Sequence, residues 1–331
     1  MILQRYKCIG SNALLGLMLG MAAVSAMAQG VLITPLGSHD GEFCRFDRAL
    51  LLEDPDGTRI LYDAGRTVAG ADDPRLGKVD LVLVSHMHGD HVGDKRIART
   101  NAGSCESPDL PVSVLPNTSS VEIALANKAV ILTGSEMPKF FASKLASLGG
   151  DPKQSQLVRF GGTKKIGGVT LTTVPAVHSN GIAGAMVGGE LGELLDASGL
   201  TAYAGPPAGY VLTFSNGLTL YLSGDTGITA EQEKVVRDHY RAKLVVINIG
   251  DTFTTGPAEA AYVINDLIKP VSVIASHANE AASHKGKLLP GTRTAQFAEA
   301  VHVPVYLPLS GITMEFTADG YCAKGCGLGN M

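Results

Sequence analysis

The 331-residue sequence contains no tryptophan, and aromatic residues of all kinds make up only 5% of it. It also lacks an excess of positive charge, because 27 lysine and arginine residues are outnumbered by 31 aspartate and glutamate residues, for a formal net charge of -4. Proteins that bind nucleic acid through its phosphate backbone need basic side chains to do so. We therefore expect no nucleic-acid partner. The hydrophobic fraction of 45% is ordinary for a globular protein.

No apolar run that would comfortably span a bilayer stands out. The run from Ala13 to Val24 follows Arg5 and Lys7 and precedes small residues that end at Ala28. This is the pattern of a secretory signal peptide, and the run is short for a membrane span. We therefore expect a signal peptide over residues 1–28, a periplasmic or secreted mature chain, and no stable membrane anchor after cleavage.

Cysteine is scarce, with five residues in the chain, and Cys8 would leave with the signal peptide. The other four are expected in an oxidising compartment, which favours disulfides. Four cysteines allow three pairings, of which we favour Cys44 with Cys105 and Cys322 with Cys326. A zinc site at the second pair is the rival interpretation, but no other nearby pair of soft ligands supports it.

An internal repeat and a linker-like Pro/Ser tract are missing too, so residues 29–331 are expected to form one domain. Turn signals at residues 54–57 and 216–217 separate apolar runs and indicate a β-hairpin in each half. Strand patterns and helical patterns alternate after each hairpin, with the helices expected at 121–129, 137–148, 229–240 and 257–268. Two sheets with helices outside follow from this order. Residues 181–209, rich in glycine and alanine, form the largest stretch without a regular pattern.

Histidine is also rare, with nine residues, yet three of them fall within six positions of the segment VDLVLVSHMHGDHVGD, residues 79–94. His86 and His88 follow a strand pattern and are two positions apart, which in an extended chain places both side chains on one face. They can therefore share an ion. The glycine that follows permits a sharp reversal, so Asp90 and His91 can face a neighbouring position. The motif indicates parts of two adjacent metal sites.

Each metal needs more ligands than this motif supplies, because zinc usually takes three or four protein ligands or water. Three other predicted strands also end in a residue that can bind metal: VTLTTVPAVH in His178, LTLYLSGD in Asp225 and VSVIASH in His277. Ligands gather beyond the carboxyl ends of strands in α/β folds. We expect these residues to complete the site, although each taken singly could instead cap a loop or make a hydrogen bond.

Four further residues are weaker candidates. His39, in PLGSHDG, could line the site, although an ordinary loop histidine fits that segment somewhat better. His284 and Lys285 follow His277 closely and could contact the substrate, or could belong to a solvated loop. Asp251 follows a strand and could orient a ligand imidazole, or could cap its own loop.

The residues also resemble a known family. HMHGDH (residues 86–91), His178, SGDTG (223–227) and SH (276–277) resemble, in order, the ligand motifs of the metallo-β-lactamase superfamily. Residues 204–227 and 248–261 look like the branch of metal-dependent hydrolases that includes ascorbate-6-phosphate lactonase. The resemblance implies an α/β fold, the four-layer αβ/βα sandwich, with a dinuclear site at one sheet edge. It also implies a ligand set: His86, His88 and His178 for the first ion, Asp90, His91 and His277 for the second, and Asp225 as the bridge.

Two divalent ions, Zn²⁺ first with Mn²⁺ or Fe²⁺ as alternatives, would lower the pKa of a shared water towards 7. Asp90 would act as a catalytic residue that helps to orient the resulting hydroxide. No G-x-S-x-G motif is present, so a serine nucleophile is not supported. Our hypothesis is an exported metal-dependent hydrolase that acts on a small-molecule ester, lactone, amide or phosphoester.

Two alternatives stay open. The same scaffold with iron could perform redox or sulfur chemistry, because imidazole and carboxylate ligands suit both metals. The chain could also be a non-catalytic metal-binding protein.

The sequence leaves the oligomeric state open. Residues 181–209 are expected to form part of the pocket wall, and their apolar character favours a neutral or partly hydrophobic substrate.

Overall fold

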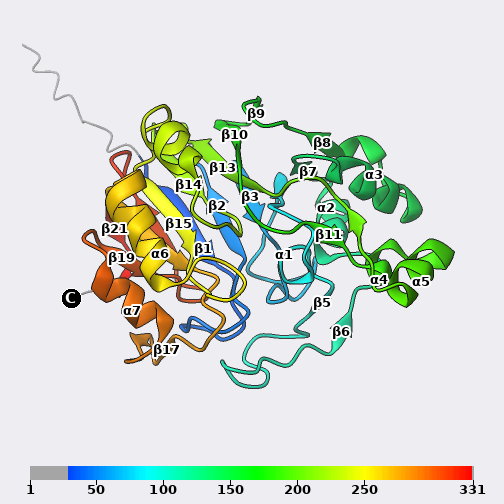
Figure 1. Ribbon diagram of the computed structural model, residues 1–331, viewed down its shortest axis with the longest axis horizontal. Coiled ribbons are helices and arrows are strands. Elements are labelled where there is room, and N and C mark those ends of the chain that lie inside the picture. Colours follow the sequence, from blue (N-terminus) through cyan, green and yellow to red (C-terminus); the bar gives the residue numbers. More distant parts are fainter. Residues whose placement is uncertain (1–28, 330–331) are drawn as a thin grey trace, which may run out of the picture.

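The computed structural model describes residues 29–329 (Figure 1). The expected signal peptide, residues 1–28, lies outside the described residues. Across the described range, no helix is both long enough and apolar enough to cross a membrane.

Two sheets of eight strands each form the centre of the fold. The first has the order β21-β20-β1-β2-β3-β4-β7-β8. Its strands, in chain order, are β1 (Val31–Pro35), β2 (Leu50–Glu53), β3 (Arg59–Tyr62), β4 (Leu81–Leu83), β7 (Val130–Thr133), β8 (Ser155–Leu157), β20 (Met314–Phe316) and β21 (Cys322–Lys324). The predicted hairpin at residues 54–57 is present, with β2 and β3 antiparallel.

The second sheet has the order β22-β19-β16-β15-β14-β13-β10-β9. Its strands are β9 (Thr163–Ile166), β10 (Val169–Pro175), β13 (Ala208–Thr213), β14 (Thr219–Leu222), β15 (Leu244–Asn248), β16 (Ser272–Ser276), β19 (Val305–Leu307) and β22 (Gly327–Leu328). Three short two-stranded pairs complete the strands: β5 (Lys95–Arg96) with β6 (Val112–Ser113), β11 (Gly181–Ile182) with β12 (Ala202–Tyr203), and β17 (Ser283–His284) with β18 (Lys287–Leu288).

The pleat of the strands explains how both faces of each sheet are buried. Successive side chains of a strand point to opposite faces. In β4, Leu81 and Leu83 lie in the apolar core between the two sheets, whereas Val82 lies in the core beneath the helices. In β13, Leu212 lies in the core between the sheets and Val211 in the core on the far side. The continuous apolar runs in the sequence reflect this burial on both faces.

Helices cover the outer face of each sheet. On the first sheet they are α2 (Ser119–Asn127) and α3 (Met137–Ser147), and on the second they are η2 (Gln232–Arg237), α6 (Pro257–Tyr262), η3 (Val263–Ile268) and α7 (Arg293–Ala300). Figure 1 shows α3 and α6 towards opposite sides of the molecule. The remaining helices are α1 (Gly89–Val92), α4 (Gly184–Val187), α5 (Gly189–Ala197) and the 3-10 turn η1 (Pro152–Gln154). The predicted four-layer αβ/βα sandwich is confirmed.

One local expectation was wrong, and two expected helices differ in detail. The region 181–209 is not irregular: it contains β11, α4, α5 and β12, with α4 and α5 packed as a helical pair joined at Gly188, whose φ of 75° only glycine adopts easily. The expected helices at 229–240 and 257–268 are present, as η2 in the first range and as α6 and η3 in the second, but η2 and η3 are π-helical. Such a change of hydrogen-bond register leaves no clear mark in hydrophobic periodicity.

The structure contains both favoured cysteine pairs as disulfides. Cys44 in the β1–β2 loop is joined to Cys105 in the β5–β6 loop, and Cys322 is joined to Cys326 across the turn between β21 and β22. The first bond ties together two loops that are 61 residues apart in the sequence.

Candidate metal centre

The strand-end residues meet at one edge of the sandwich. Strands β14, β15 and β16 are parallel, so their carboxyl ends, which precede Asp225 and His277, lie at the same edge. Strand β10, which precedes His178, runs in the same direction, because it is antiparallel to β13 and β13 is antiparallel to β14. In the facing sheet, β4 leads into His86 and then α1.

The seven predicted ligands form overlapping groups in which the ligand atoms lie within 4.8 Å of one another. The groups are His86, His88 and His178; Asp90, His91 and His277; and His86, His91 and Asp225. The first two correspond to the two ligand sets implied by the family resemblance, and the third contains a member of each.

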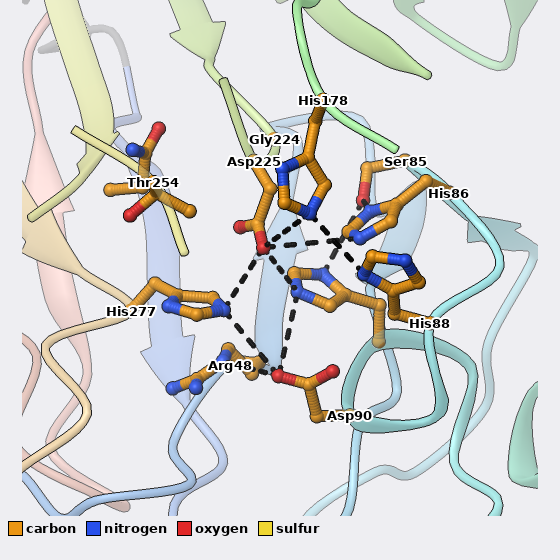
Figure 2. Close-up of polar contacts among 12 residues, drawn as sticks. Arg48, Ser85, His86, His88, Asp90, His178, Gly224, Asp225, Thr254 and His277 are labelled. Carbon is orange, nitrogen blue, oxygen red and sulfur yellow. Dashed lines mark hydrogen bonds and ion pairs between the residues drawn. The ribbon is translucent and has the colours of Figure 1, made fainter. Parts of the chain in front are cut away.

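Asp225 lies at the centre of the cluster (Figure 2). Its Oδ2 atom is 3.0 Å from His277 Nε2 and 3.3 Å from His91 Nε2. The same oxygen is 3.7 Å from His178 Nε2 and 3.8 Å from His86 Nε2. One carboxylate oxygen therefore faces imidazoles of both ligand sets, which is the position a bridging ligand requires.

Two imidazoles are oriented by hydrogen bonds at Nδ1, which leaves Nε2 for an ion. His91 Nδ1 lies 2.8 Å from Asp63 Oδ2, and His86 Nδ1 lies 2.9 Å from Ser85 Oγ. Ser85 in turn donates to both oxygens of Asp63, through its backbone N–H at 2.9 Å and its hydroxyl at 2.7 Å. A carboxylate behind a ligand histidine fixes the ring and its tautomer.

The residues present fit divalent ions. The Nε2 atoms of His86 and His91 are buried and have no hydrogen-bond partner among the described residues, although buried polar atoms are normally satisfied. An ion at each position would satisfy them. The donor set contains only imidazole nitrogen and carboxylate oxygen, which suits zinc, manganese or iron.

The electrostatics of the cluster keep five of the candidate ligands in metal-binding form. His91 is the exception: burial would lower its pKa, but Asp225, Asp90 and Asp63 raise it well above its usual range, so this ring must release a proton when an ion binds. Burial lowers the pKa of His86, His88 and His178, so these imidazoles are neutral near pH 7. Burial alone would raise the pKa of Asp225, but His277 and His91 hold it well below its usual range. The pKa of Asp90 is also held well below its usual range, against the effect of burial, by His91 and His277 with Arg48.

Arg48 was not predicted. It contacts Asp90, a member of the second ligand group. Its side chain is only 2% exposed, and its Nε atom lies 3.4 Å from Asp90 Oδ2. Its Nη2 atom donates to Asn279 Oδ1 at 2.6 Å. Asp63 was missed as well, although it follows β3 directly and so obeys the same strand-end rule that located the ligands. Nothing in the local pattern around Arg48 distinguishes it from a surface arginine.

Asn180 is a third residue that the sequence did not indicate. Its side-chain oxygen accepts from the backbone N–H of Met87 at 2.8 Å, and its nitrogen donates to the carbonyl of Gly205 at 2.9 Å. It thereby joins the histidine motif to the segment that carries His178.

A cavity of about 370 Å³ opens above the cluster. Five predicted ligands line it: His88, Asp90, His178, Asp225 and His277. The other lining residues are Arg45, Phe46, Arg48, Arg66, Ser179, Phe253 and Asn279. Residues 181–209 are not among them, so the expectation that this region forms the pocket wall was wrong. It is folded instead into its own helical pair.

The predicted substrate residues do not line this cavity. His39 Nδ1 lies 3.1 Å from Ser38 Oγ, and His284 is exposed in β17, where it pairs with β18. The backbone N–H of Lys285 donates to Glu42. Tertiary packing, which the local sequence does not reveal, places all three outside the cavity lining.

Asp251 does not orient an imidazole either. It is exposed, and its carboxylate accepts from the backbone N–H of Thr252 at 2.7 Å. The residue beside the His277 ring is Gly250, where an added Cβ would lie 3.0 Å from Nδ1. Close approach of backbone, rather than a carboxylate, confines this ring.

Comparison with known proteins agrees with this geometry. Residues 58–278 match the family model described as the Beta-lactamase superfamily domain. A UPF0173 metal-dependent hydrolase of Koribacter versatilis is 29% identical over 67% of this chain and 77% of its own length. Another, from Cupriavidus necator, is 31% identical over 73% of this chain and 71% of its own length.

Among solved structures, the chain is similar to Igni18, a metallo hydrolase from the archaeon Ignicoccus hospitalis. The TM-score is 0.54 at 20% sequence identity, with 86% of this chain and 100% of the other covered. At this identity the likeness concerns the fold.

Proposed function

Because the chain belongs to the metallo-β-lactamase superfamily and is a metal-dependent hydrolase, we propose that it hydrolyses a small ester, lactone, amide or phosphoester at a centre of two divalent ions. Zn²⁺ is the proposed metal. The observation that carries this proposal is the position of Asp225, whose Oδ2 atom lies within 3.8 Å of imidazoles from both ligand sets.

His86, His88 and His178 would hold the first ion, Asp90, His91 and His277 the second, and Asp225 both. When bound, such ions supply a water of lowered pKa and polarise the oxygen of the scissile group.

Asp90 is the side chain that we place beside the reacting atoms, where it would orient the attacking water. Its pKa is held well below the usual range, so the carboxylate is ionised at neutral pH and can accept a hydrogen bond from an attacking water. Arg48 contacts Oδ2, which limits rotation of the carboxylate. Asp90 lines the cavity, so a substrate can reach it.

Removal of the metal should abolish the activity reversibly. Dialysis against a chelator is expected to lower hydrolysis of the best substrate on the order of a thousandfold, and added Zn²⁺ should restore it. The substrates to assay are a lactone, a β-lactam, a carboxylic ester and a phosphodiester. Full activity of the chelated, metal-free protein would contradict the proposal, and bound iron with oxygen consumption would favour the redox alternative.

We also propose that the chain is exported, based on the apolar run from Ala13 to Val24 and the small residues that end at Ala28. The disulfide between Cys44 and Cys105 agrees with an oxidising compartment. N-terminal sequencing of the protein from fractionated cells should find it in the periplasm or the medium, beginning at Gln29. A cytosolic chain that retains Met1 would refute export.

A further inference from the structure

Resting on the proposed function, we propose that the natural substrate carries a planar apolar group, such as an aryl ring, held beside the metal centre by Phe46 and Phe253. These two phenylalanines line the same cavity as the ligands. They come from different sheets, Phe46 from the β1–β2 loop and Phe253 from the loop after β15.

Phe253 is a large apolar side chain left open to solvent at a functional cavity. It is 69% exposed, and burying a side chain of this kind against a ligand is favourable. The two preceding residues, Asp251 and Thr252, have φ values of 56° and 59°. Positive φ is rare for a β-branched residue, and such strain clusters at ligand-binding sites. The backbone thus holds an exposed ring at the rim at a conformational cost.

Phe46 is fixed in place on the other wall. The Cζ atoms of Arg45 and Arg66 lie 5.6 Å and 5.9 Å from the centre of its ring, within the range of a cation–π contact. The backbone N–H of Arg45 donates to the carbonyl of Cys105 at 3.1 Å, and the disulfide joins Cys105 to Cys44, two residues before Phe46. The ring is therefore part of a braced wall rather than a free loop.

The charges of this wall are already paired. Arg66 donates to both oxygens of Asp94 at 2.7 Å and 2.8 Å, and Arg45 pairs with Glu106 at 3.2 Å. The Arg66 guanidinium is thus held by both oxygens of Asp94, whereas Arg45, whose side chain is 46% exposed, is engaged by Glu106 through Nη1 alone. What the wall offers a substrate is aromatic surface, whereas polar recognition is concentrated at the ligands on the cavity floor.

A pair of phosphonates tests this inference without turnover. Phenylphosphonate and methylphosphonate share an anionic group that can reach the metal centre and differ only in the apolar substituent. By isothermal titration calorimetry of the zinc-loaded protein, phenylphosphonate should bind roughly tenfold more tightly, the size of an aromatic contact of about 1.4 kcal/mol. In Phe253→Ala and Phe46→Ala the preference should fall to about twofold or less, while methylphosphonate binds as before.

Phe160→Ala is the matched control, because Phe160 is 38% exposed but lines a different cavity, with Glu136 and Tyr203. It should keep the full preference. Equal affinities of the wild-type protein for the two phosphonates, no binding of phenylphosphonate, or a preference that survives both cavity substitutions would overturn the inference. The proposed function is judged separately, by whether the zinc-loaded protein hydrolyses any of its four assay substrates.

Discussion

Asp225→Ala is expected to lose both metal ions and to reduce hydrolysis on the order of a thousandfold or more. Both ligand groups share this carboxylate, since its Oδ2 atom lies 3.0 Å from His277 Nε2 and 3.7 Å from His178 Nε2. Its removal takes away the negative charge that offsets two divalent cations in a buried site, and an uncompensated buried charge is costly. Ion content by mass spectrometry and the rate of hydrolysis are the measurements.

Loss of folding must be separated from loss of metal in this variant. The far-ultraviolet circular dichroism spectrum should match that of the wild-type protein, because Asp225 follows β14 and takes no part in its ladder with β13 or β15. Asp196→Ala removes an exposed carboxylate from α5 and should change neither ion content nor rate. A folded Asp225→Ala protein that retains two ions and normal activity would show that Asp225 does not bridge.

Asp63→Asn is expected to weaken binding of the second ion by about 10- to 100-fold. Asp63 Oδ2 lies 2.8 Å from His91 Nδ1 and holds the ring with Nε2 towards the ion. An asparagine keeps the volume of the side chain, and with its oxygen at the Oδ1 position it can still accept from the backbone N–H of Ser85. Its amide nitrogen then faces His91 and cannot accept a hydrogen bond from Nδ1–H. The ring then turns or changes tautomer, and its ligand atom is lost.

Competition with a chromogenic chelator measures this affinity directly. The matched control is Asp80→Asn, since Asp80 accepts from Arg59 N at 3.0 Å and makes no contact with a ligand. The control should bind both ions as the wild-type protein does. Unchanged affinity in Asp63→Asn would mean that the histidine is oriented by packing alone.

The clustering of the seven candidate ligands could be predicted because their physical signal is local. Each follows a strong apolar strand, and the carboxyl ends of such strands gather at one edge of the fold. His178 is 90 residues from His88 in the sequence, yet their ring nitrogens lie 3.3 Å apart. Asp63 obeys the same rule, because it directly follows Tyr62 at the end of β3.

The substrate residues could not be predicted in this way. The chemistry of His39, His284 and Lys285 and their place in the sequence suggest substrate contacts, but none of the three lines the cavity. Phe46 and Phe253 carry no catalytic chemistry, so nothing in the sequence pointed to them. Their role depends on which loops meet over the cavity, and this is decided by the packing of the two sheets and by the bond between Cys44 and Cys105.

We propose that the Asp225 carboxylate is shared by two metal ions. The number of metal ions per purified wild-type chain tests this most directly. Inductively coupled plasma mass spectrometry against a quantified protein concentration should give two divalent ions per chain, with zinc predominant. One ion per chain at saturation, or none, would contradict the dinuclear centre built around Asp225.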